Sequence, residues 1–223
     1  MAEELRLHAF WPTMLFTTDW DEHARHAASL TAFLYALESA QKAPIDSGIA
    51  VGAKARQGLS EGDLGLFERA HPALDALKRF IGRSVQQAVA RANGGRVKPG
   101  AIRVEVTDSW YHITRDRGFH DAHAHPGCSW CGIYYLQVGD SGPVEGGAPN
   151  GLNRFYCPIS TGGMVSDYGA AYLNAGYVDP PVRDGMLILF PAHLQHSGLP
   201  YAGSRDRLII SFNSRSYLGP KPS

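Results

Sequence analysis

Residues 186–213 read MLILFPAHLQHSGLPYAGSRDRLIISFN and contain two short apolar runs, at 186–190 and 208–212. Apolar runs of this length, bounded by proline, glycine and charged residues, are typical of buried β-strands. His196 lies between the two runs, where the first predicted strand has ended. The stretch therefore predicts two core strands, with a histidine at the mouth of whatever sheet or barrel they form.

Three further segments upstream carry strand patterns. Residues 102–106 (IRVEV) alternate strictly between apolar and polar, residues 109–114 are a second candidate, and residues 131–138 are rich in β-branched and aromatic side chains. A glycine-rich hairpin or loop is expected at 139–151. Many short strands separated by glycine and proline predict a sandwich, barrel or jelly roll.

The first half of the chain carries helical patterns instead. Residues 17–19 (TTD) are typical helix caps, and apolar residues with helical spacing follow them. Residues 45–62 are rich in glycine and serine and predict a loop. A second helix is expected to begin at Pro72, a favourable first-turn residue, and to stop at Asn93.

Helices followed by strands argue against alternating βαβ units and a doubly wound sheet. The 223 residues are enough for one domain with a sizeable core. We therefore expect a single domain over residues 1–223, mainly β with N-terminal helices. Residues 1–98 would form the mainly helical part, and residues 99–223 the jelly-roll core.

The amino-acid composition bears on which partners the protein is expected to bind. Lys plus Arg equals Asp plus Glu at 21 each, so no nucleic-acid partner is expected. The chain shows neither a secretory signal pattern nor an apolar run long enough to span a bilayer, so we expect no membrane partner and a cytoplasmic protein. Three cysteines, Cys128, Cys131 and Cys157, are an odd number in a long chain and predict free thiols.

Histidines gather in one segment. Four of the ten histidines are His112, His120, His123 and His125. In an extended segment, His123 and His125 would point to the same face, and His196 is the best third ligand from another strand. Imidazole suits iron, zinc, copper and nickel, and three protein ligands leave coordination positions open for chemistry. The pattern predicts a catalytic metal site, whereas His112 and His120 could be supporting or surface groups.

Two signatures resemble a known family. HAHPGCSWCGIYYLQ at 123–137 resembles the HxHP…SGxYYL signature of the 2-oxoglutarate- and Fe(II)-dependent oxygenase superfamily. Residues 185–213 resemble its second signature, a G-x-L-x-x-F-P strand, a histidine, and an arginine that opens an RxxISFN strand; Trp110 also has a counterpart. The resemblance covers roughly residues 100–215. It implies a double-stranded β-helix (jelly roll, cupin-like) and a dioxygenase that hydroxylates its substrate, with Fe(II) and 2-oxoglutarate as cofactors.

The resemblance also assigns roles to residues. His123 matches the first metal histidine and His196 the distal one. His125 falls where most of the superfamily carries a carboxylate. Arg207 matches the arginine that receives the far carboxylate of 2-oxoglutarate, and Tyr135 matches a tyrosine that binds the same carboxylate.

One departure leaves alternatives open. The usual facial triad has two histidines and a carboxylate, but here His-x-Asp and His-x-Glu are lacking. Asp121 with His123 and His196 is the second choice of ligands. All-histidine sites also occur in cupin dioxygenases that use no 2-oxoglutarate, in which case Arg207 would hold a substrate carboxylate. A non-catalytic, metal-binding cupin-like module is the third hypothesis.

Several residues near the signatures have plainer interpretations. Cys128-x-x-Cys131 runs into a predicted strand, so neither a redox pair nor a zinc site is favoured. Trp130 is interpreted as core, Tyr134 is expected to face away from Tyr135 across the sheet, and His193 is expected to be exposed.

Three further questions stay open at this level. Arg205 lies close enough to Arg207 to exchange roles with it, although the RLIISFN alignment favours Arg207. The long segment 161–181 carries Tyr168, Tyr172 and Tyr177 and suits a substrate loop. The prime substrate is unidentified, with a small molecule expected, and a homodimer is one option for the assembly.

Overall fold

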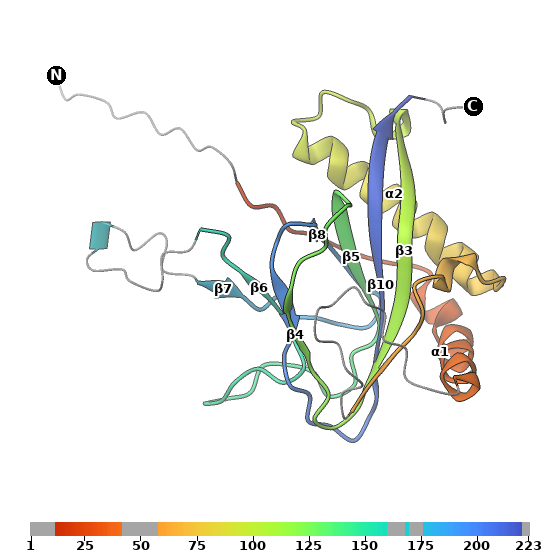
Figure 1. Ribbon diagram of the computed structural model, residues 1–223, viewed down its shortest axis with the longest axis vertical. Coiled ribbons are helices and arrows are strands. Elements are labelled where there is room, and N and C mark those ends of the chain that lie inside the picture. The colour runs from red at the N-terminus through yellow and green to blue at the C-terminus, as the bar shows by residue number, and fades with distance from the viewer. Residues whose placement is uncertain (1–11, 42–57, 160–167, 170–175, 220–223) are drawn as a thin grey trace.

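The computed structural model describes residues 12–41, 58–159, 168–169 and 176–219, which form two antiparallel sheets and two α-helices (Figure 1). The larger sheet has the strand order β1-β8-β5-β10-β3-β2. Its strands are β1 (Phe16–Asp19), β2 (Leu59–Glu61), β3 (Ile102–Thr114), β5 (Trp130–Gln137), β8 (Met186–Pro191) and β10 (Arg207–Leu218). The smaller sheet has the order β4-β9-β6-β7. Its strands are β4 (His120–His123), β6 (Asn153–Tyr156), β7 (Tyr177–Val178) and β9 (His196–Gly198). This arrangement confirms the predicted mainly β fold with N-terminal helices, a double-stranded β-helix.

Helices cover the face of the larger sheet that points away from the smaller sheet (Figure 1). They are α1 (His23–Ala40) and α2 (Pro72–Ala92), and two short 3₁₀ turns lie at Leu66–Glu68 and Pro99–Ala101. Helix α2 begins at Pro72 as predicted, and its apolar stripe of Leu74, Leu77, Ile81 and Val85 is fully buried. Among the described helices, none is long and apolar enough to cross a membrane.

Both faces of the larger sheet are buried, and this explains its continuous apolar runs. On β10, Leu208, Ile210 and Phe212 pack toward the helices, whereas Ile209 packs toward the smaller sheet. On β8, residues 187 and 189 pack toward the helices, whereas residues 186, 188 and 190 pack toward the smaller sheet. Because successive side chains point to opposite faces, a strand covered on both sides needs apolar residues at every position.

Two expectations for the N-terminal half are wrong. Residues 17–19 belong to strand β1, and α1 starts only at His23, without a side-chain cap. Thr17 and Thr18 pair with the open edge of β8, where β-branched residues fit well. Residues 59–61 form β2 beside β3, not a loop, while residues 42–57 lie outside the described part of the chain. The first half thus supplies both edge strands of the larger sheet.

The strands of the second half are longer or shorter than expected. The two segments predicted at 102–106 and 109–114 are one strand, β3, which pairs with β10 along its whole length apart from one register shift. Residues 139–151 form turns held by a bridge between Gly142 and Asn150, as expected for a loop. The short strands of the smaller sheet were not predicted, because two to four residues carry too little periodicity.

The close packing of β5 leaves no room for a side chain at Gly132. A Cβ atom at Gly132 would meet the ring of Phe212 and lie 2.9 Å from Leu189 Cδ2, both in the core beneath the helices. We expect Gly132→Ala to lower the free energy of unfolding by about 1–3 kcal/mol through overpacking, measured by urea denaturation. The matched control is Gly142→Ala, which meets nothing within 4 Å. Equal stability of the two variants would contradict this account.

Candidate metal centre

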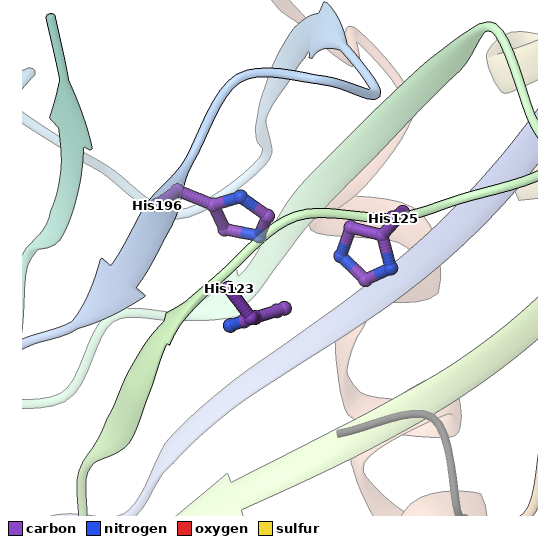
Figure 2. Close-up of side chains that lie close together, drawn as sticks. All are labelled: His123, His125 and His196. Atoms are coloured by element: carbon purple, nitrogen blue, oxygen red, sulfur yellow. The ribbon is translucent and has the colours of Figure 1, made fainter. Parts of the chain in front are cut away.

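Three histidines converge between the two sheets. His123 ends β4 and His196 begins β9, and the two residues are direct partners in the antiparallel pair. His125 lies two residues beyond β4, where its backbone N–H donates to the carbonyl of Ala192 at 3.0 Å. One ligand atom from each histidine lies within 4.8 Å of the others. Figure 2 shows the three rings gathered around one space, as a metal site requires.

Backbone hydrogen bonds select the ring nitrogens that could bind a metal. His123 Nδ1 donates to the carbonyl of Asp121 at 2.7 Å, and His196 Nδ1 donates to the carbonyl of Leu194 at 3.1 Å. A carbonyl oxygen can only accept, so each Nδ1 carries the proton and each Nε2 keeps a lone pair for a metal. His125 Nδ1 is buried without a hydrogen-bond partner among the described residues. An orphaned buried nitrogen is costly, and a metal ion bound by the ring would explain why it is tolerated.

The electrostatic environment keeps His125 and His196 neutral. Burial and the neighbouring His123 lower the pKa of His125 to about 4. The same causes, burial first, hold the pKa of His196 well below its usual range. Both rings are therefore neutral near pH 7, which is the form that binds metal ions.

Asp121 does not join this cluster. Its side chain is exposed, and its carboxylate is not among the groups whose ligand atoms meet within 4.8 Å. The register of β4 against β9 shifts between His120 and His123, which breaks the two-residue periodicity on which the Asp121 alternative depended. Asp121 contributes its carbonyl to the orientation of His123 instead.

A buried cation lies in the same pocket as the three histidines. Arg207 is 4% exposed, and its Nη2 donates to Asn153 Oδ1 at 2.6 Å. The hydroxyl of Tyr135 donates to the same oxygen at 2.7 Å, and the Arg207 guanidinium carbon lies 5.5 Å from the Tyr135 ring centre. Within the described ranges, no carboxylate pairs with Arg207, and its Nε is buried without a hydrogen bond. Burial alone lowers its pKa. A buried guanidinium in this state provides a strong site for an anion.

Arg205 does not compete for this position. Its side chain is exposed and its Nε donates to Asp140 Oδ1 at 2.9 Å, in a turn before β10. Arg207 is the first residue of β10 and shares the inner face with Ile209, since the two are separated by two positions.

Asn153 is the polar residue of this pocket that sequence reasoning missed. It begins β6, is buried, and accepts hydrogen bonds from both Arg207 and Tyr135. No motif marks it in the sequence, because its partners lie on two distant strands. Trp110, which the family resemblance did single out, packs its ring 5.6 Å from that of His125 and donates to His112 Nε2 at 3.1 Å.

The plainer interpretations are confirmed. Trp130 packs against Phe16, with ring centres 5.6 Å apart, in the core beneath the helices. Tyr134 faces the same core and shares a 2.7 Å hydrogen bond with His23, so it points away from the histidines. His193 is exposed.

The predicted free thiols are confirmed too. Cys128, Cys131 and Cys157 are unbridged, and Cys131 Sγ donates to Asn213 Oδ1 at 3.2 Å. Most of the proposed substrate loop at 161–181 lies outside the described residues; within it, Tyr177 is exposed and packs against Arg154.

Comparison with solved structures identifies the fold. A prolyl-4-hydroxylase from Pseudomonas putida is similar with a TM-score of 0.55 and 13% identity, over 91% of this chain and 93% of that chain. The α-ketoglutarate-dependent epimerase SnoN from nogalamycin biosynthesis has a TM-score of 0.58 and 14% identity, over 93% and 81%. HygX from Streptomyces hygroscopicus, with nickel, 2-oxoglutarate and hygromycin B bound, has a TM-score of 0.56 and 13% identity, over 91% and 83%. None of the curated proteins compared matches this sequence.

The fold is that of the double-stranded β-helix class, and its three clustered histidines could hold a metal ion. Residues 108–213 match the family model described as "Putative 2OG-Fe(II) oxygenase". The matched segment contains the three histidines, Arg207 and both signatures. The family model and the two signatures both support the assignment of this segment to the 2-oxoglutarate- and Fe(II)-dependent oxygenase superfamily.

The shared acceptor in the pocket generates a prediction about stability. Asn153→Ala leaves the buried donors of Arg207 and Tyr135 without their partner, so we expect the free energy of unfolding to fall by about 2–3 kcal/mol. Tyr135→Phe removes only one donor and should cost about 1 kcal/mol. Urea denaturation measures both. If Asn153→Ala were as stable as the wild type, the shared-acceptor arrangement would be wrong.

Proposed function

We propose that this protein is an Fe(II)- and 2-oxoglutarate-dependent dioxygenase that hydroxylates a substrate in the pocket beside the three histidines. The observation that carries the proposal is the presence, in one pocket, of three clustered imidazoles and the buried guanidinium of Arg207. A 2-oxoglutarate molecule has a keto-acid end that binds a metal and a second carboxylate that needs a cation. The pocket offers one partner for each end.

His123, His125 and His196 would hold the metal ion and leave further coordination positions open. Fe(II) with 2-oxoglutarate, when bound there, supplies the dioxygen-dependent oxidation of a substrate C–H bond. The protein contributes position and exclusion of water. Phe155 and Phe190 pack against the His196 ring, with ring centres 5.9 and 4.6 Å away, and hold it from the side of the inner core.

Arg207 and Tyr135 would bind the far carboxylate. Guanidinium presents a planar fork that matches a carboxylate, and it stays charged at any physiological pH. Burial raises the pKa of Tyr135, so its hydroxyl remains protonated and can donate. Asn153 Oδ1 accepts from both side chains and holds them next to each other. Arg207 keeps further N–H donors for an anion, whereas Tyr135 has one O–H and would have to turn it from Asn153 to the carboxylate.

The all-histidine ligand set favours a second candidate function. Three neutral ligands leave the full charge of the metal uncompensated, unlike a set that contains a carboxylate. An organic substrate could therefore bind the metal directly, as in dioxygenases that use no 2-oxoglutarate, and Arg207 would hold its carboxylate. The two functions differ in whether 2-oxoglutarate is converted to succinate.

The pocket also bears on the substrate. Apolar side chains, among them Trp110, Phe119 and Leu199, line it beside the histidines. These walls suit a small molecule with an apolar portion. A cytoplasmic location, a homodimer, the lack of nucleic-acid and membrane partners, and a single domain over residues 1–223 stay predictions.

The assignment of cofactors is tested by anaerobic titration of the metal-free protein with Fe(II) and then 2-oxoglutarate. We expect a visible metal-to-ligand charge-transfer band in the wild type and none in His125→Ala or His196→Ala, because each variant loses a metal ligand. His193→Ala and Asp121→Asn should keep the band. Iron binding without a band, and no succinate on admission of oxygen, would favour the second candidate function.

The role of Arg207 is tested by the affinity for 2-oxoglutarate. In Arg207→Met, the loss of a charged hydrogen bond of about 1.5–3 kcal/mol should raise the Kd of 2-oxoglutarate roughly tenfold to a hundredfold. The affinity for Fe(II) should stay unchanged. Arg205→Met is the matched control. An unchanged Kd in Arg207→Met would remove the arginine from the co-substrate site.

A further inference from the structure

A second group of potential metal ligands lies beside the three histidines. Glu61, His112 and His120 bring one ligand atom each to within 4.8 Å of one another. They come from β2, β3 and β4, so both sheets contribute. Glu61 and His112 are direct partners in the pairing of β2 with β3. No sequence motif links the three, and the proposed oxygenase site does not use them.

A carboxylate and an imidazole meet at the contact between Glu61 and His112. Glu61 Oε2 lies 3.4 Å from His112 Nε2, and both side chains are largely buried. The indole N–H of Trp110 donates to the same Nε2 at 3.1 Å. Because an indole N–H can only donate, Nε2 must present its lone pair, and a carboxylate oxygen also only accepts. Both atoms are therefore acceptors of the kind that bind divalent metal ions, and an ion at this position would take the place of the indole N–H at Nε2.

His120 completes the group from the smaller sheet. Its ring stacks on that of His112, with centres 5.4 Å apart and planes 22° from parallel. Its Nδ1 lies 3.2 Å from the carbonyl of Asp121, which can only accept, so Nε2 keeps a lone pair. The His120 ring is also 4.3 Å from that of His123, so the two groups adjoin.

We propose that Glu61, His112 and His120 form a second binding site, for a divalent first-row metal ion, next to the three-histidine centre. Two imidazoles and one carboxylate are a set of ligands that suits Fe(II), Co(II) and Zn(II). A bound ion would connect β2 and β3 of the larger sheet with β4 of the smaller sheet, along the wall of the pocket. The proposal does not depend on the use of 2-oxoglutarate.

The test is the stoichiometry of Co(II) binding to the full chain, by anaerobic equilibrium dialysis and elemental analysis. We expect two ions per chain in the wild type and one in Glu61→Gln and in His120→Gln. The double variant His125→Ala/His196→Ala should also bind one ion. Glu105→Gln and His193→Gln replace exposed residues of the same types, and should still bind two.

Thermal unfolding gives a second readout. Co(II) should raise the Tm of the His125→Ala/His196→Ala variant, and this rise should be lost when Glu61→Gln is added. One ion in the wild type that both Glu61→Gln and His120→Gln retain would overturn the proposal, as would two ions retained in both. One ion that Glu61→Gln loses, and that the double histidine variant keeps, would support this site and contradict the three-histidine ligand set.

Discussion

The antiparallel pairing of β4 with β9 is the constraint on which the site depends. It sets His123 opposite His196, and the return of the chain at His125 then adds the third ring. A slip of one residue in this short pair would turn one histidine to the other face. Only a few residues pair here, so the register is held by the neighbouring core, where Phe155 and Phe190 pack against His196. The arrangement of the three histidines thus depends on apolar packing.

The pocket buries two polar groups that would be more stable in contact with water. Arg207 is buried without a carboxylate in the described chain, and His125 has a buried nitrogen without a partner. Both features are unfavourable in the protein alone, and binding of an anion and a metal ion, as proposed, would remove this cost. The proposed binding of a metal ion and a co-substrate therefore explains the burial of these two groups, whereas a purely structural role does not. Asn153 limits the cost by accepting from both Arg207 and Tyr135.

The mainly helical N-terminal half completes the larger sheet. Its two strands, β1 and β2, close the two edges of the larger sheet, and its helices bury the outer face. Strand β2 also places Glu61 opposite His112, which lines the pocket. A segment that the family model does not match therefore supplies a polar group beside the matched site, and variation in this half could alter the pocket without any change in the signatures.

The sequence alone determined the buried strands of the second half, because short apolar runs such as MLILF and LIISF, bounded by proline, glycine and charged residues, suit a sheet covered on both faces. It also determined His123, His125 and His196 as a group, through their spacing and the two signatures. Tertiary structure decided the rest. It made residues 17–19 a strand where local preference favoured a cap, and it brought Asn153 to Arg207 and Glu61 to His112. These outcomes depend on hydrogen bonds and contacts between residues 45 or more positions apart in the chain, which no local pattern encodes.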